Sequence, residues 1–163
     1  MNLPEFRYHP DPIASGSVVV SDTQCRSCKQ KRGYIYEGPV YAEEDLDEKL
    51  CPWCIADGAA SVKFDATFVD SEAFADDTPE SAMDEISLRT PGFSSWQGEQ
   101  WPACCDDATA FLMPAGTKEI KEHFRELESA AGLPRSLNKE EGPTAYVFRC
   151  LHCEALKFYV DQP

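Results

Sequence analysis

Residues 25–54 read CRSCKQKRGYIYEGPVYAEEDLDEKLCPWC, and this stretch decides most of what the sequence predicts. It holds two C-x-x-C pairs, formed by Cys25 with Cys28 and by Cys51 with Cys54. A C-x-x-C pair wraps one metal ion through a tight turn, and two such knuckles complete the tetrahedron that zinc prefers. The spacing therefore predicts one closed zinc site with four thiolate ligands.

Two other interpretations of this stretch stay open. Lys29, Lys31 and Arg32 would offset the negative charge of a zinc–thiolate centre, but beside two tyrosines they would also suit a zinc ribbon that binds nucleic acid. The sequence Cys51-Pro-Trp-Cys54 resembles a dithiol redox motif, because a cysteine at a helix start has a lowered pKa. A redox motif needs only one pair, however, and here a second pair stands at zinc spacing.

The remaining four cysteines form a second candidate set. Cys150 and Cys153 make a good half-site, and the adjacent Cys104 and Cys105 would complete a second zinc site. Adjacent side chains point apart in a strand, so both can bind one ion only at an irregular turn. If one of them does not bind, the substitute ligands to consider are His152, His123 and Asp107.

The composition limits the functions to consider. The chain has 163 residues and a net charge of −14, which disfavours nucleic acid and favours a basic partner. We find no secretory signal and no apolar run of membrane-spanning length, so we expect a cytoplasmic protein. With three histidines and no phosphate-binding or nucleophile-elbow motif, the chain shows no catalytic constellation, and we expect that it is not an enzyme.

The patterning predicts an α+β fold, in which small antiparallel β-hairpins carry zinc knuckles and pack with a few short helices. Residues 64–88 are rich in acids and contain no lysine or arginine, but their phenylalanines argue against disorder. We expect a single compact domain over 1–163; the alternative is two sub-units, 1–63 and 90–163, joined by the acidic segment 64–89.

The same patterning predicts the individual helices and strands. They are a strand at 18–20, a hairpin over 33–42, a short helix that stops at Gly58, a helix over 79–88 capped by Thr78, a helix over 118–131 capped by Thr117, and a hairpin built from AYVFRC and ALKFYV.

Four stretches resemble the CbrC family, also called UPF0167. They are LPEFRYHPDP, the cysteine stretch extended to CPWCIADGAA, TPGFSSWQGEQWPACCDDATAFL, and YVFRCLHCEALKFYVD, and they span nearly the whole chain. The resemblance implies a small bacterial cytoplasmic protein, and the member that gives the family its name is associated with tolerance to a nuclease colicin. By position, the two cysteine sets would be the family's two cysteine clusters.

We therefore expect a non-enzymatic, zinc-binding interaction protein with a role in toxin tolerance or immunity. Its acidic surface, chiefly residues 65–85, would bind a basic partner such as a nuclease toxin domain. The alternatives are a zinc-ribbon module in nucleic-acid or regulatory binding, and a dithiol oxidoreductase that acts through Cys51 and Cys54.

Overall fold

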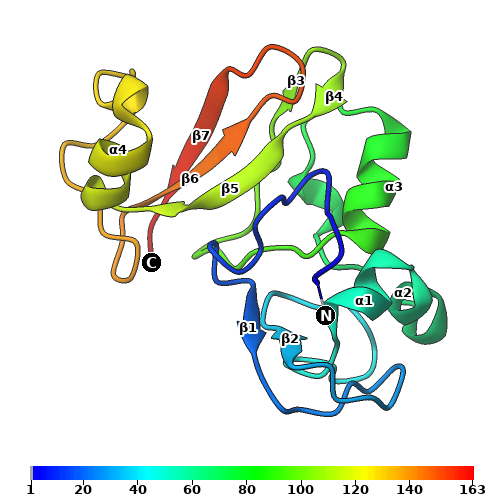
Figure 1. Ribbon diagram of the computed structural model, residues 1–163. Coiled ribbons are helices and arrows are strands. Elements are labelled where there is room, and N and C mark those ends of the chain that lie inside the picture. Colours follow the sequence, from blue (N-terminus) through cyan, green and yellow to red (C-terminus); the bar gives the residue numbers. More distant parts are fainter. Residues whose placement is uncertain (1) are drawn as a thin grey trace.

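A three-stranded antiparallel sheet with the order β5-β6-β7 lies at the centre of the computed structural model, which describes residues 2–163 (Figure 1). Its strands are β5 (Ala110–Ala115), β6 (Thr144–Arg149) and β7 (Leu156–Asp161). The β6–β7 hairpin is the one that the sequence predicts, with Arg149 paired to Leu156 beside the turn. The pairing of β5 with β6 joins segments far apart in the chain, which local patterning does not reveal.

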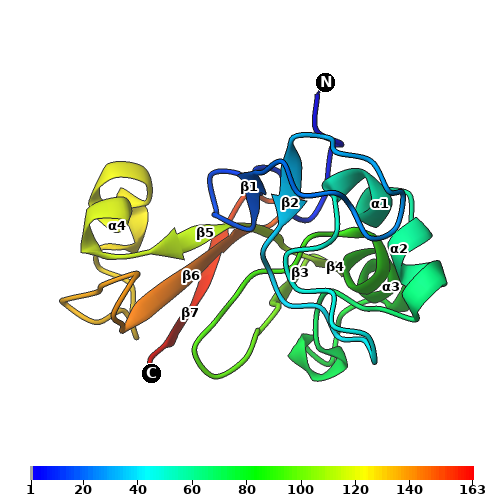
Figure 2. The same ribbon diagram turned by 90° about the horizontal axis from the view of Figure 1, so that it is seen from below.

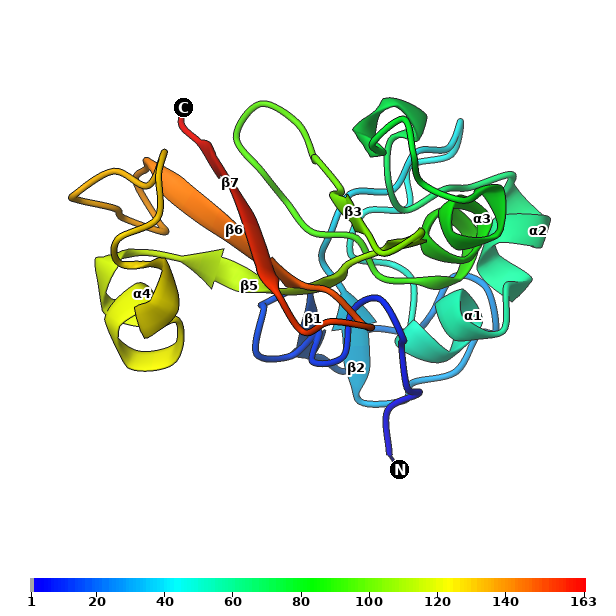
Figure 3. The same cartoon turned by 90° about the horizontal axis from the view of Figure 1, so that it is seen from above.

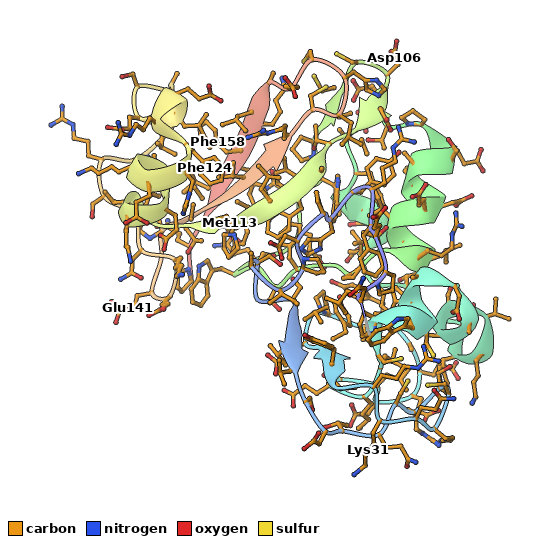
Figure 4. All side chains as sticks on the ribbon, in the orientation of Figure 1. Lys31, Asp106, Met113, Phe124, Glu141 and Phe158 are labelled. Atoms are coloured by element: carbon orange, nitrogen blue, oxygen red, sulfur yellow. The ribbon has the colours of Figure 1, made fainter. Side chains whose placement is uncertain are left out.

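The central strand β6 is buried on both faces, because each face of the sheet packs on a different cluster. Ala145 and Val147 face a cluster around the helix α4 (Thr117–His123), which contributes Ile120. Figure 4 labels Met113, Phe124 and Phe158 where this helix meets the sheet. The alternate positions Tyr146 and Phe148 belong to the opposite cluster, as the two-residue period of a strand requires.

The opposite cluster is rich in aromatic side chains and lies under the helix α3 (Glu80–Arg89). Phe93 stacks on Phe111 with ring centroids 4.0 Å apart, and the fully buried Trp101 donates its indole N–H to the carbonyl of Thr109. α3 contributes Ala82 and Ile86 to this cluster, so its acidic residues face outward. Figures 2 and 3 show α3 and α4 at opposite ends of the molecule.

The N-terminal part holds short elements around a third cluster. These are β1 (Val18–Val20), β2 (Tyr34–Tyr36), α1 (Pro52–Ala56) and α2 (Ala59–Phe64). The predicted strand at 18–20 and the short helix before Gly58 are confirmed. The predicted hairpin over 33–42 is wrong, because β2 pairs with β1 and the chain turns away after it. Tyr41 instead forms an isolated bridge with Thr67.

The two longer helices begin or end at other residues than the sequence predicts. Pro79, not Thr78, is the residue that caps α3, and the buried hydroxyl of Thr78 has no hydrogen-bond partner within residues 2–163. α4 ends at His123, and a 3₁₀ turn over Arg125–Leu127 follows it. Gly116 caps α4 in place of Thr117, with Glu119 accepting a hydrogen bond from the Gly116 amide. The apolar stripe is buried at Ile120, Phe124 and Leu127.

Two small elements complete the α+β fold, which agrees with the predicted class. β3 (Ala103–Cys104) and β4 (Asp107–Ala108) form a two-residue antiparallel hairpin, and a 3₁₀ turn covers Ser71–Ala73. None of the helices within residues 2–163 has the length and apolar character needed to span a bilayer. The cysteines lie in or beside the turns and ends of these small elements.

Candidate metal centres

The first centre brings together the four cysteines of the opening stretch. The ligand atoms of Cys25, Cys28, Cys51 and Cys54 all lie within 4.8 Å of one another. Cys25 and Cys28 lie in the loop between β1 and β2, whereas Cys51 is the residue that caps α1 and Cys54 lies inside that helix. The two C-x-x-C pairs therefore face each other, as their spacing predicts.

The sulfur spacing in this centre fits a tetrahedral zinc ion. Sγ of Cys25 lies 3.9 Å from Sγ of Cys54, and Sγ of Cys28 lies 3.9 Å from Sγ of Cys51. Zinc–sulfur bonds of about 2.3 Å place two sulfurs of a tetrahedron about 3.8 Å apart. A disulfide would bring its two sulfurs to about 2 Å. The spacing therefore fits four thiolates around one ion and not a disulfide.

Backbone hydrogen bonds shape the knuckle and favour the thiolate form of Cys25. Hydrogen bonding from the Cys51 thiol and from nearby backbone amides favours the charged form of the Cys25 sulfur and lowers the pKa of that thiol, against the opposing effect of burial. The Cys51 amide lies 3.3 Å from that sulfur. Main-chain bonds then join the two halves, since the Arg26 amide donates to the Lys49 carbonyl at 2.7 Å. A deprotonated, hydrogen-bonded sulfur is the form that binds metal.

Three basic residues beside the first centre make local contacts. Arg26 pairs with Glu44 at 2.7 Å, and Lys63 donates to the carbonyl of Ser27 at 2.8 Å. The guanidinium of Arg32 lies over the Trp53 ring, 5.4 Å from its centroid. These contacts hold three basic side chains against the loops of the first centre, whereas Lys29 and Lys31 are exposed.

The second centre brings together Cys104, Cys105, Cys150 and Cys153, again with ligand atoms within 4.8 Å. Sγ of Cys104 lies 3.7 Å from the sulfurs of both Cys105 and Cys153, close to the tetrahedral edge of about 3.8 Å. The β6–β7 turn forms a knuckle, in which the amides of His152 and Cys153 each lie 3.4 Å from the Cys150 sulfur. The structure thus pairs the vicinal cysteines with the second knuckle.

The β3–β4 turn explains how two adjacent cysteines face one ion. Cys105 and Asp106 have φ angles of +55° and +58°, the left-handed values that a tight two-residue hairpin turn requires at both central positions. This turn bends the chain so sharply that the Cys105 sulfur comes to the same side as the Cys104 sulfur. Asp106 marks the tip of the hairpin in Figure 4. The sequence predicts an irregular turn at the two adjacent cysteines, and the structure shows a two-residue hairpin turn of a regular type there.

The substitute ligands considered from the sequence lie outside the sulfur cluster. His152 Nε2 contacts the Asp107 carboxylate at 2.8 Å, and His123 lies at the end of α4. Asp107 also accepts hydrogen bonds from Arg7 and from the Tyr8 hydroxyl, each at 2.7 Å. Burial opposes its ionisation, but these bonds prevail and lower the pKa of Asp107. Sequence reasoning missed this carboxylate as an anchor between the second centre and the N-terminal segment, because nothing local links positions 7 and 107.

Comparisons with known proteins cover almost the entire chain. A family model described as an uncharacterised protein family, UPF0167, matches residues 3–162. UPF0167 proteins of Mycobacterium bovis and Mycobacterium tuberculosis are each 45% identical over 174 residues, covering 98% of this chain and 93% of theirs. A UPF0167 protein of Pseudomonas aeruginosa is 39% identical over 173 residues, covering 98% of this chain and 97% of its own. No solved structure matches. The chain therefore belongs to the UPF0167 family.

Proposed function

We propose that this protein is a non-enzymatic interaction protein, stabilised by zinc in both cysteine centres, whose acidic surface binds a basic protein. The observation that carries the zinc part is the presence of two separate groups of four thiols, each with tetrahedral sulfur spacing. Zinc centres with four thiolates are closed and serve structure, since no position remains for water or substrate. The centres then have structural roles, and the function lies on the surface.

The charge distribution supports a basic partner. The acidic segment, defined here as residues 65–85, has seven exposed carboxylates, and within residues 2–163 none of them forms an ion pair: Asp65, Asp70, Glu72, Asp76, Asp77, Glu80 and Asp84. Unpaired carboxylates on one region leave a negative field that accelerates the association of a basic protein. With the overall charge of −14, this favours a protein partner over nucleic acid.

A nuclease toxin domain is the partner class that fits this surface best. A nuclease must present a basic surface to the phosphates of its substrate, and an acidic protein that covers this surface blocks substrate binding. The resemblance to a family whose name-bearing member is associated with colicin tolerance supports the same class. The proposed role is therefore toxin tolerance by direct, electrostatically steered binding.

Two measurements test the two parts of this proposal. Metal analysis of the purified protein should give two zinc ions per chain, and replacing single cysteines of one centre should remove one of them. Binding to a nuclease toxin domain should be measured at low and high salt. We expect association to slow by about tenfold or more as salt rises, because screening weakens steering.

A charge-neutralised variant locates the surface. Glu80→Gln with Asp84→Asn removes two exposed charges on α3, whereas Glu126→Gln with Glu128→Gln removes two exposed charges beside α4, at the other end of the molecule (Figure 1). We expect only the first pair to slow association. Absence of binding at low salt, or equal effects of both pairs, would contradict the proposed surface.

A further inference from the structure

The two centres have the same four-cysteine composition but differ sharply in exposure. In the first centre Cys25, Cys51 and Cys54 are 0%, 1% and 4% exposed, and these side chains belong to the core cluster of the N-terminal part. In the second centre Cys105 and Cys153 are exposed to solvent. They lie at the turns of the β3–β4 and β6–β7 hairpins (Figure 1). Two cysteines of the second centre therefore lie at the surface, in contact with solvent.

Within the second centre, backbone amides serve the buried sulfur and not the exposed ones. The amides of His152 and Cys153 each lie 3.4 Å from the Cys150 sulfur, whereas within residues 2–163 no amide donates to the sulfurs of the exposed Cys105 and Cys153. A hydrogen bond to a thiolate draws off its negative charge and lowers its nucleophilicity, so in this centre Cys105 and Cys153 are more reactive than Cys150.

Charged residues also differ near the two centres. In the first centre Lys63 bonds the carbonyl of Ser27, which lies between two ligand cysteines. In the second, the exposed Asp106 is next to Cys105, and the exposed His152 and Glu154 flank Cys153. Accessibility is thus the difference that sets the second centre apart.

We propose that the second centre is an oxidant-sensitive modification site, at which a peroxide converts Cys105 and Cys153 to a disulfide and releases zinc. This rests on the two zinc centres of the proposed function. One thiolate attacks a peroxide oxygen, the O–O bond breaks, and a sulfenic acid and hydroxide form. The second thiolate attacks the sulfenic sulfur, the S–S bond forms, and another hydroxide leaves. The sulfurs lose two electrons in total, and two solvent protons turn the hydroxides into water.

The response is local because the surrounding structure does not depend on the two exposed sulfurs. The β6–β7 ladder is paired along its length up to Arg149 and Leu156, and Asp107 still ties the hairpin to Arg7 and Tyr8. Both cysteines of the new bond already have ligand atoms within 4.8 Å of each other. Oxidation therefore changes the charge and metal content of this tip while the first centre keeps its zinc, and a dithiol reductant with added zinc reverses it.

Differential cysteine labelling of the purified, zinc-loaded wild-type protein tests this inference. The protein is treated with hydrogen peroxide, its free thiols are alkylated with a light reagent, and its newly reduced thiols are alkylated with a heavy one. We expect heavy label at Cys105 and Cys153, light label at all four cysteines of the first centre after denaturation, and release of half of the bound zinc. The first centre serves as the matched control within the same molecule.

The possible results separate this inference from the zinc proposal. Metal analysis before peroxide shows whether both centres hold zinc, and a value of one per chain would contradict the two-zinc proposal while the labelling still reports which thiols react. Heavy label appearing equally in both centres, or first in Cys25, Cys28, Cys51 and Cys54, would overturn the inference. Resistance of Cys105 and Cys153 to peroxide would overturn it as well.

Discussion

At the scale of single residues, His9 shows how a polar group can become part of a core. Its ring is fully buried, with Nδ1 2.6 Å from the Pro91 carbonyl and Nε2 2.7 Å from the Ser15 hydroxyl. Burial lowers the pKa of His9 from 6.5 to about 4, against the opposing effects of the Pro91 carbonyl and Asp11. His9 is therefore a neutral cross-link between the N-terminal segment and the chain that follows α3.

This pKa shift predicts a pH dependence of stability. The unfolded chain binds a proton on His9 below pH 6.5, but the folded protein does so only near pH 4, so acid favours unfolding between these values. The stability from the neutral ring is present above pH 6.5 and is lost as the pH falls toward 4. Lowering the pH from about 7.5 to about 5.5 should reduce the free energy of unfolding by about 1 kcal/mol more in wild type than in His9→Gln.

Urea unfolding of both proteins at the two pH values measures this difference. Acid also protonates the cysteine thiolates, but it does so in both proteins, so the comparison isolates the histidine. Equal losses in wild type and His9→Gln would show that the ring is not held neutral by burial.

At the scale of elements, side-chain periodicity predicted which residues are buried, but it predicted the ends of the helices poorly. The stripe of Ile120, Phe124 and Leu127 is buried as predicted, yet α4 stops at His123 because Phe124 leaves the helical region with φ −134° and ψ 45°. Side-chain spacing does not encode that change of backbone. Similarly, the C-x-x-C spacing predicted both knuckles, whereas the contact of Asp107 with Arg7 depends on the tertiary fold.

A mutation at the start of α3 can distinguish Thr78, the N-cap predicted from the sequence, from Pro79, the N-cap in the structure. The sequence predicts Thr78 as the N-cap, whose hydroxyl oxygen would accept a backbone N–H, but this buried hydroxyl lacks a partner within residues 2–163. A buried hydroxyl without a partner carries a desolvation cost, so Thr78→Val should raise the free energy of unfolding by up to about 1 kcal/mol. If Thr78 were the cap, the same change would lower it by about 1 kcal/mol.

Thr90 at the other end of α3 provides the matched control. Its hydroxyl is buried and donates to the Glu85 carbonyl at 2.9 Å. Thr90→Val should therefore destabilise the protein by about 1 kcal/mol, since it leaves the volume nearly unchanged and removes one hydrogen bond. Chemical unfolding of the two variants should give changes of opposite sign, and a shared sign would refute the structural cap assignment.

At the scale of the whole molecule, the part around the first centre is joined to the aromatic cluster by hydrogen bonds of Tyr36 and by a close approach at Gly92. The Tyr36 hydroxyl donates to the Pro39 carbonyl and accepts from the Gly92 amide, which joins the first-centre region to the chain after α3. At Gly92 an added Cβ would lie 2.0 Å from the Phe68 carbonyl oxygen, so a side chain there would force these parts apart. These contacts support our prediction that 1–163 unfolds as one domain.

The two centres should contribute very differently to that domain. Three of the four first-centre cysteines are core residues, and Cys28 packs against them. The strands of this region have three residues and its helices five and six, too short to be stable alone. The second centre instead joins two turns whose neighbouring sheet is already covered on both faces. Loss of the first zinc should therefore remove most of the stability, and loss of the second only a small part.

Cys54→Ser and Cys153→Ser make the same chemical change in one ligand of each centre, one buried and one exposed. We expect Cys54→Ser to abolish cooperative unfolding at ambient temperature, because weakened zinc binding also leaves three thiols in the core without their counter-ion. Cys153→Ser should keep a cooperative transition at a modestly lower Tm. Thermal unfolding followed by near-ultraviolet circular dichroism reports on both regions, since Trp53 lies in the first cluster and Trp101 in the second. Similar losses in the two variants would mean that both centres support the core, and would remove the physical basis for treating the exposed centre as the one that responds to oxidants.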